Sequence, residues 1–307
     1  MRFPGRDAIV ATAGESIARG SRSFAAASKL FDPKTRERAW LLYAWCRRCD
    51  DIVDGQDHGH GMTRVADPAA RLAEVRERTA AALAGEWVGD SAFDALRIVA
   101  AETGMPHRFA WDLIDGFALD AEDWRPQTED DLLRYCYHVA GVVGCMMAVV
   151  MGVRPDDAAV LDRACDLGLA FQLANIARDI GEDAEAGRCY LPADWLAEVG
   201  LSAADPMADH AALAILGTRL ADRAEGYESS ARGGAAALSF RSAWAVLAAA
   251  DIYGGIARKV RLRGPQAWDS RTTTSGSEKL GAIVKAWGEA RRRAPTPRPA
   301  GLWTRPR

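Results

Sequence analysis

Two sets of oxygen-bearing side chains in the 307-residue sequence have a spacing that suits a metal ion. Asn175, Asp179 and Asp183 follow one another at intervals of four, and Asp50 and Asp54 repeat that interval far upstream. Side chains four residues apart lie on one face of an α-helix. Mg²⁺ prefers oxygen ligands and is typically held by one or two carboxylates together with substrate phosphate oxygens. The spacing therefore predicts two helices that hold Mg²⁺ and, with it, a diphosphate.

The surroundings of these acids favour a site over an ordinary solvated helix face, which is the more common meaning of such a pair. Asp50 and Asp54 follow the apolar and aromatic segment 41–45 rather than a run of charges. Like charges at this spacing repel one another unless a cation is present. Arg47 and Arg178 lie beside the two acidic sets, where a guanidinium group can bind phosphate oxygens. Together these features indicate a diphosphate-binding site.

The composition is that of an ordinary globular protein, with 49% hydrophobic and 26% charged residues. The net charge of −3 conceals an uneven distribution. Residues 291–307 hold six arginines and no acid, so the rest of the chain has 39 − 6 = 33 basic against 42 acidic residues. An acidic body of this kind argues against nucleic acid as a partner.

The periodicity of apolar residues predicts helices throughout, separated by prolines, and no run alternates as a strand does. We expect one all-α domain over residues 1–290. The tail 291–307 holds four prolines beside its arginines, and we expect it to be disordered. The expected helices cover roughly 7–28, 35–54, 69–84, 91–103, 107–118, 129–152, 156–182, 208–231, 237–263 and 277–290.

An uncharged stretch, Val139–Val153, resembles a membrane span in composition. It is shorter than the roughly 20 residues that a spanning helix needs. It also contains Gly141, Gly144 and Gly152, which allow neighbouring helices or a ligand to approach closely. We therefore expect a central helix that is buried on all sides.

The cysteines indicate neither disulfides nor a metal site. Cys46 and Cys49 form the only close pair, and no second pair or histidine pair completes a zinc site. The others lie in apolar helical patterns, as small buried thiols do. The first seventeen residues lack the apolar run of a signal peptide. A reducing cytoplasm is the expected location.

Several further motifs, in order, resemble the squalene/phytoene synthase family of head-to-head isoprenoid synthases, and most closely its bacterial phytoene synthase branch. The segment 43–54 resembles the first Asp-rich motif of that family, and 168–192 resembles the second with its following turn. The segment 135–144 is similar to the family's Tyr-Cys-x-x-Val-Ala-Gly-x-Val-Gly signature. Further similarities are the Ser-x-Ser-Phe element at 21–24, Tyr253 and the segment 267–271. The resemblance extends from about Ser16 to Trp287.

The resemblance implies an isoprenoid-synthase-type helical bundle around a central cavity. It also implies a set of site residues. The metal ligands, for Mg²⁺ or Mn²⁺, would be Asp50, Asp54, Asn175, Asp179 and, as a third member of its column, Asp183. The catalytic residues would be Asp50, Asp54, Asp179, Tyr43 and Arg178. The substrate contacts would be Ser21, Arg22, Ser23, Phe24, Tyr43, Arg47, Tyr137, Val139, Ala140, Gly144, Gln172, Asn175, Arg178, Tyr253 and Arg271.

The reaction that the resemblance implies is a two-step coupling of two prenyl diphosphates. In the phytoene branch, two geranylgeranyl diphosphates form prephytoene diphosphate and then phytoene, with loss of a proton and of two diphosphates. No nicotinamide is expected, and the sequence has no strand–glycine-rich turn–helix unit for a dinucleotide. Two alternatives stay open. One is a farnesyl diphosphate-using enzyme that forms presqualene diphosphate, dehydrosqualene or squalene. The other is a non-catalytic helical scaffold of the same fold.

A lipidic substrate also implies peripheral contact with a membrane, which we expect at the inner face of the cell membrane. The arginines of 291–307, with Leu302 and Trp303, are one candidate surface for anionic lipid. A solvated, disordered tail is the simpler alternative.

Overall fold

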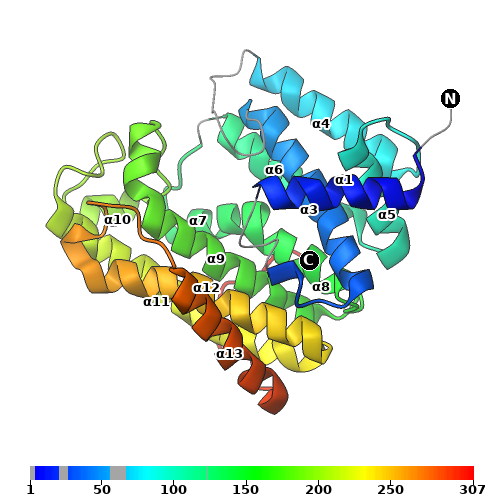
Figure 1. Cartoon of the computed structure of the whole chain (residues 1–307). Coiled ribbons are helices and arrows are strands. Elements are labelled where there is room, and N and C mark those ends of the chain that lie inside the picture. The colour runs from blue at the N-terminus through cyan, green and yellow to red at the C-terminus, as the bar shows by residue number, and fades with distance from the viewer. Residues whose placement is uncertain (1–3, 21–26, 56–66, 123) are drawn as a thin grey trace. The chain divides into compact units, whose positions relative to one another are not determined.

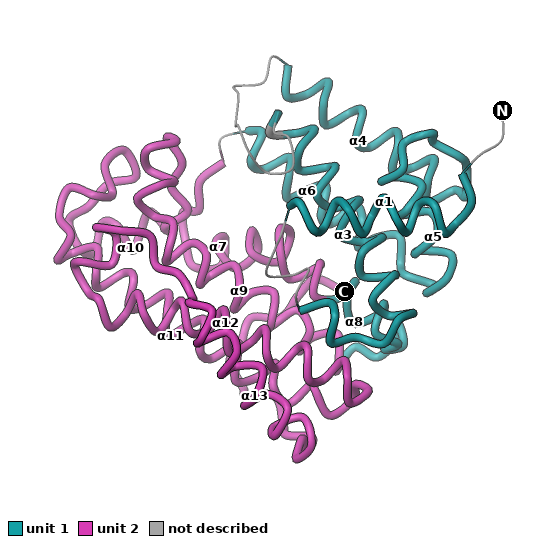
Figure 2. The backbone as a smooth tube through the Cα atoms, in the orientation of Figure 1, with its two compact units in different colours: residues 1–122, 145–158 teal, residues 123–144, 159–307 magenta. Residues whose placement is uncertain are grey.

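The computed structural model describes residues 4–20, 27–55, 67–122 and 124–307, and within these ranges the protein is helical (Figure 1). No described residue belongs to a β-strand, and the one bridge found there joins Ser202 to Asp205. The all-α prediction is therefore confirmed. Figure 2 shows that the chain divides into two compact units, residues 1–122 with 145–158 and residues 123–144 with 159–307. The single domain expected over 1–290 stays a prediction.

The first unit is built around α3, which packs against α1, α4 and α5. Its interior is aliphatic and aromatic, and Trp45 of α3 is fully buried. Aspartates 32, 67 and 90 each cap a helix by accepting a backbone N–H through the side chain, which satisfies an amide that the helix leaves unpaired. The helices of this unit are α1 (Arg6–Gly20), α3 (Pro33–Asp54), α4 (Pro68–Leu83), α5 (Ser91–Thr103) and α6 (His107–Ala121).

The second unit contains the long helix α9 (Ala158–Glu185) and the helices that follow it. Capping boxes at Thr128 with Asp131 and at Ser275 with Glu278 fix where α7 and α13 begin. The remaining elements are α7 (Glu129–Cys136), η1 (Tyr137–Gly141), α8 (Val142–Val150, which continues into the first unit), α10 (Ala193–Glu198), α11 (His210–Gly234), η2 (Ala235–Ala237), α12 (Phe240–Arg263), η3 (Gly264–Gln266) and α13 (Gly276–Arg292).

Most of the expected helices are present within a few residues of their predicted bounds. Helix α10 was not predicted, because six residues are too few to show helical periodicity. The first expected helix, 7–28, is described as far as Gly20, and its residues 21–26 lie outside the described part of the chain. The expected helix 129–152 is interrupted by η1, a single π-helical turn over Tyr137–Gly141.

One helical stretch among the described residues, Glu129–Val150, is long and apolar enough to cross a membrane by length and composition alone. Of its most apolar window, 61% is buried inside the protein. Within it, Val139, Ala140, Val143 and Gly144 are only half-buried. The expectation of burial on all sides was therefore too strong, because one narrow apolar face stays accessible.

Helix α9 carries acidic side chains on two opposite faces. Asp166 and Asn175 are about two and a half turns apart, which places them roughly on opposite sides of the helix. Asp162 and Asp166 form one column, and both are buried. A buried carboxylate needs a cationic partner, because its ionised form is costly to remove from water.

The C-terminal tail supplies those partners. Arg298 forms two hydrogen bonds with Asp166, with Nε–Oδ2 and Nη2–Oδ1 distances of 2.8 and 2.7 Å. Arg305 Nε and Arg307 Nη2 each lie 2.9 Å from a carboxylate oxygen of Asp162. The structure thus differs from the disorder expected for 291–307. Composition suggested a solvated tail, whereas two buried acids far away in the sequence bind it.

Replacing Arg298 with alanine should lower the free energy of unfolding by about 2 kcal/mol, because it leaves Asp166 charged, buried and short of a partner. Chemical denaturation measures the loss. The matched control is Arg292→Ala, since Arg292 is exposed and its loss should cost less than about 0.5 kcal/mol. Equal stability of Arg298→Ala and the parent chain would show that the bond between Arg298 and Asp166 does not stabilise the fold.

Candidate active site

The first acidic set lies on the last turns of α3. Arg47 Nη1 is 2.7 Å from Asp50 Oδ2 and 3.6 Å from Asp51 Oδ1. Asp51 is buried, whereas the side chain of Asp50 is 31% exposed. Asp54 is the final residue of α3, and its side chain lies outside the described part of the structure. The predicted neighbours Arg47 and Asp50 are thus together, with Asp50 the more accessible acid.

Tyr43 lies one turn before Arg47 on the same face of α3. Burial raises the pKa of the Tyr43 hydroxyl, and the positive charge of Arg47 partly offsets that rise. Gly20, at the end of α1, lies so close to this hydroxyl that a side chain at position 20 would overlap it. The predicted contacts Ser21, Arg22, Ser23 and Phe24 come directly after Gly20, but they lie outside the described residues.

The second acidic set lies on α9, and Asp179 is its best-connected member. Arg178 Nε donates to Asp179 Oδ1 at 2.6 Å, and the other guanidinium nitrogen pairs with Oδ2. Arg271, from the segment after η3, brings Nη2 to 3.0 Å from the same Oδ1. Two cations that the sequence predicted as diphosphate contacts therefore converge on a carboxylate that it predicted as a metal ligand.

Asn175 lies one turn before Asp179 and has an unusual side chain. Its Oδ1 is buried, and no described residue donates a hydrogen bond to it. Leaving such an acceptor unpaired costs about 1–3 kcal/mol, so natural proteins rarely do so without a reason. A neutral amide oxygen beside a carboxylate fits the oxygen ligands that Mg²⁺ prefers.

The structure says less about the other two site residues predicted on α9. Gln172 and Asp183 are half-buried, one turn to either side of the central pair. No group of three or more His, Cys, Asp or Glu side chains gathers closely enough for a metal ion among the described residues, which exclude the Asp54 side chain. The residues present fit Mg²⁺ by their chemistry, and the full ligand set stays a prediction.

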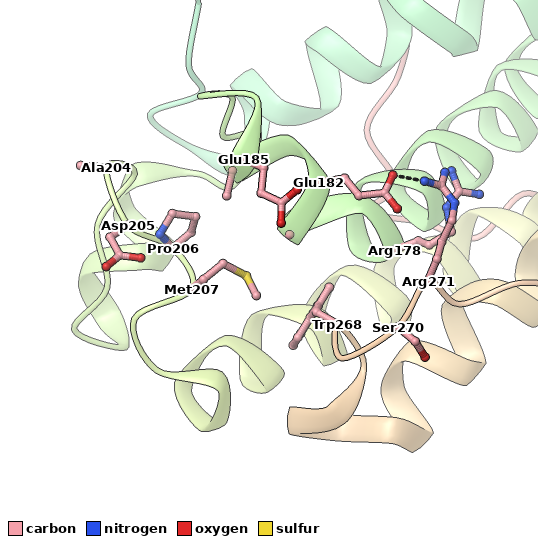
Figure 3. A pocket seen from close by; sticks show the side chains of 12 residues that line it. Arg178, Glu182, Glu185, Ala204, Asp205, Pro206, Met207, Trp268, Ser270 and Arg271 are labelled. Carbon is pink, nitrogen blue, oxygen red and sulfur yellow. Dashed lines mark hydrogen bonds and ion pairs between the residues drawn. The ribbon is translucent and has the colours of Figure 1, made fainter. Parts of the chain in front are cut away.

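A cavity of about 450 Å³ opens beside the C-terminal half of α9 (Figure 3). Arg178 and Arg271 lie next to each other on one side of it, and Arg271 also pairs with Glu182. Trp268 lines the same cavity and donates its indole N–H to the carbonyl of Ala177 at 3.0 Å. This bond ties the segment that carries Arg271 to α9. Sequence reasoning missed Glu182, although it lies one turn after Arg178 within the Asp-rich motif.

An aromatic pair stands near these arginines. The rings of Phe171 on α9 and Tyr253 on α12 stack with a centroid distance of 4.2 Å. Burial raises the pKa of Tyr253, and the charge of Arg178 acts in the opposite direction, so the phenol lies within the field of that guanidinium. The structure thus brings predicted contacts from α9 and α12 together.

The π-helical turn η1 presents the predicted apolar contacts. Val139 and Ala140 of η1 are half-buried, as is Gly144 at the start of α8. Gly168 of α9 lies against the carbonyl of Ala140, so closely that a Cβ at position 168 would overlap backbone atoms. Gly144 has the same relation to the carbonyl of Ala164. These glycines let α9 and η1 meet backbone to backbone.

Tyr137 differs from the other predicted contacts on this turn. Its side chain is 1% exposed, and its ring lies 6.0 Å, centroid to centroid, from the ring of Trp303 in the tail. Tyr137 therefore belongs to the packing of the turn, while its neighbours Val139 and Ala140 keep accessible surface.

The cysteines agree with the sequence-based interpretation. All six are free, and all but Cys46 are buried. Burial raises the pKa of the Cys46 thiol to about 12, which keeps it protonated at neutral pH.

Comparison with known proteins identifies the family to which this chain belongs. The family model for squalene/phytoene synthase matches residues 17–278. The chain belongs to the squalene/phytoene synthase family. A phytoene synthase from Pseudescherichia vulneris is 51% identical over 301 residues, covering 96% of this chain and 97% of the relative. A 15-cis-phytoene synthase from Pantoea ananas is 50% identical, covering 95% and 96%.

The fold agrees with this family. A crystal structure of a dehydrosqualene synthase in complex with a ligand superimposes with a TM-score of 0.82 at 27% identity, covering 94% of this chain and 98% of that one. As a squalene/phytoene synthase family member, the chain is a prenyltransferase-type enzyme of isoprenoid biosynthesis that takes a prenyl diphosphate. The resemblance noted from the motifs is confirmed.

Replacing Gly168 with alanine should destabilise the protein by about 2 kcal/mol, because the new methyl group forces α9 and η1 apart. Thermal or chemical denaturation measures the change. Gly226 of α11 provides the control, since no atom lies within 4 Å of the Cβ added there. Gly226→Ala should gain up to about 0.5–1 kcal/mol. A Gly168→Ala protein as stable as the Gly226→Ala protein would refute the close approach.

Proposed function

We propose that this chain condenses two molecules of geranylgeranyl diphosphate, through prephytoene diphosphate, to 15-cis-phytoene and releases two diphosphates. The observation that carries this proposal is identity of about 50%, along nearly the whole chain, to relatives named 15-cis-phytoene synthase. Asp50, Asn175 and Asp179, the oxygen-bearing residues expected to hold the metal, are all present in the sequence. A non-catalytic scaffold would have no need to keep a costly set of acids and arginines.

Arg178 and Arg271 are the groups that we propose bind the leaving diphosphate. Each already donates to a carboxylate, and phosphate oxygens are equally good acceptors for the planar guanidinium fork. Glu182 holds Arg271 from the other side, so its side chain is oriented before substrate arrives. We expect the same role for Arg47 beside the first acidic set.

The acids are proposed to hold Mg²⁺ or Mn²⁺. Asn175 and Asp179 would supply oxygens from α9, with Asp183 as the third member, and Asp50 and Asp54 would supply them from α3. When bound, the metal stabilises negative charge on the departing diphosphate. We propose no nicotinamide, since the final carbocation loses a proton rather than gaining hydride.

The apolar residues would protect the allylic carbocation. Val139, Ala140 and Gly144 offer a surface without hydrogen-bonding side chains, which excludes water that would quench the cation. The stacked rings of Phe171 and Tyr253 can stabilise positive charge through their faces. The same lining suits either prenyl chain length.

A farnesyl diphosphate-using enzyme is therefore the second candidate, favoured by the similarity to the dehydrosqualene synthase structure. Product analysis with the purified protein, Mg²⁺ and each labelled prenyl diphosphate, with and without a nicotinamide, separates the two. We expect phytoene from the twenty-carbon substrate without a reductant. Product from the fifteen-carbon substrate alone would overturn the proposal.

Asp179→Asn and Asp50→Asn should each lower kcat/KM by roughly 100-fold or more, because each removes a charge that stabilises the transition state. Chelation with EDTA should abolish turnover, and added Mg²⁺ should restore it. Asp156→Asn, at an exposed acid, serves as the control with near-normal turnover. Wild-type rates in Asp179→Asn would show that the acidic column on α9 has another purpose.

We also propose that the protein meets the cell membrane from the cytoplasmic side, through α13 rather than through the tail. Trp303 is half-buried, and its indole N–H donates to Asp130. On α13, by contrast, Leu280, Val284 and Trp287 are exposed and lie along one face. Exposed basic residues, Lys285, Arg291 and Arg292, accompany them. Apolar side chains flanked by cations suit an anionic lipid surface.

Changing Leu280, Val284 and Trp287 together to glutamine should weaken partitioning onto anionic vesicles by about tenfold or more. Sedimentation with vesicles measures it, and turnover of detergent-dispersed substrate should stay normal. The control is Ile215→Gln with Leu262→Gln, which alters two exposed apolar residues away from α13. Unchanged partitioning of the triple variant would reject this surface.

A further inference from the structure

The π-helical turn η1 is packed against the C-terminal tail on the side where Tyr137 lies. The rings of Tyr137 and Trp303 are 6.0 Å apart and inclined at 48°. Tyr137 is almost fully buried, so the indole of Trp303 forms part of the wall that covers it. A contact between aromatic rings at this distance contributes beyond simple burial.

Trp303 is held in place by three separate bonds. Its backbone N–H donates to the Tyr227 hydroxyl at 3.3 Å, and its indole N–H donates to Asp130 on α7 at 2.9 Å. Its carbonyl accepts from Arg298 at 2.8 Å, and that arginine is the one bound to buried Asp166. The position of the indole is thus set from α7, α9 and α11 at once.

A single π-helical turn inside a longer helix is an uncommon arrangement that is frequently found at functional sites. Here the backbone N–H of Val142 bonds to the carbonyl of Tyr137, and the turn between them carries Val139 and Ala140. Gly168 of α9 limits the turn on one side, and Tyr137 with Trp303 limits it on another. Fixing Tyr137 therefore fixes where the half-buried face of the turn lies.

We propose that Trp303 is a positioning residue for the reaction, which acts through Tyr137 to hold the π-helical turn in the shape that the prenyl chain requires. The contacts of the tail with α9, above all those of Arg298, keep Trp303 in this position. This inference rests on the proposed function for its catalytic consequence, because Val139, Ala140 and Gly144 are the apolar contacts assigned to the substrate. Its structural part concerns the free protein alone.

The test uses the full chain with Trp303→Ala, Trp303→Phe and, as the matched control in the same tail, Leu302→Ala. Hydrogen exchange of the amides in 137–144 is followed without substrate, with α13 as the internal reference. Trp303→Ala should raise exchange in 137–144 by about tenfold and leave α13 unchanged. Trp303→Phe, which keeps a ring against Tyr137, should stay within about twofold of the parent chain, as should Leu302→Ala.

The same variants are then assayed with geranylgeranyl diphosphate. Trp303→Ala should lower kcat about fivefold with KM within twofold, and should release a larger share of the cyclopropylcarbinyl diphosphate intermediate. Trp303→Phe should restore the parent values. Tyr227→Phe, which removes one bond to Trp303 and leaves the indole in place, gives a milder version of the Trp303→Ala result should that protein fold poorly.

Three results would overturn the proposal. If Trp303→Ala leaves hydrogen exchange in 137–144 unchanged, the π-helical turn does not depend on the Trp303 ring. Equal acceleration in α13 would show general loosening, and failure of Trp303→Phe to restore exchange would exclude the ring contact as the cause. A parent chain that is inactive on geranylgeranyl diphosphate would overturn the proposed function, while hydrogen exchange would still decide whether Trp303 holds the turn.

Discussion

Helix α9 depends on the neutralisation of carboxylates that it carries on opposite faces. On one face Asp162 and Asp166 are buried and are matched by arginines 298, 305 and 307 from the tail. On the other face Asp179 is matched by Arg178 and Arg271. Burial makes an unpaired carboxylate costly, so each face requires cations. The buried face needs permanent partners, which fold-stabilising arginines supply. The accessible face has partners that can also bind phosphate, which leaves this column available for the proposed diphosphate chemistry.

Close approach between backbones is the second requirement of the site. Gly168 and Gly144 allow α9 to lie directly on the helix that contains η1. Larger side chains at these positions would push the acidic column away from the apolar face of the turn. The site thus combines an acidic helix, a π-helical turn that carries the small apolar residues Val139 and Ala140, and an arginine-bearing segment that Trp268 ties to α9. The residues that we propose for diphosphate binding and for carbocation protection thus lie on neighbouring elements of the second unit.

The sequence predicted much of this. The helices around Asp50 and Asp179 followed from apolar periodicity and proline positions, and the four-residue spacing of the acids led to the diphosphate hypothesis. The structure of the tail was harder to predict, because six arginines and four prolines in 291–307 are typical of a solvated chain end. Its partners, Asp162 and Asp166, lie more than a hundred residues away, and only the fold brings them within 3 Å of Arg298 and Arg305. Tyr137 was predicted as a substrate contact from its motif, yet its ring lies against Trp303.

By itself, the sequence determined the helical class, the candidate metal and diphosphate residues, and the family, because these rest on residue type and on spacing along single helices. Only the tertiary structure decided which acids serve structure and which stay available for chemistry. Asp166 and Asp179 look alike in sequence, and both stand in apolar helical surroundings. Their roles differ because opposite faces of one helix meet different neighbours, and contacts between distant segments are not encoded in local periodicity. Asn175 shows the same division. Its spacing from Asp179 predicted a metal ligand, and only the fold showed that its side-chain oxygen is buried without a partner among the described residues.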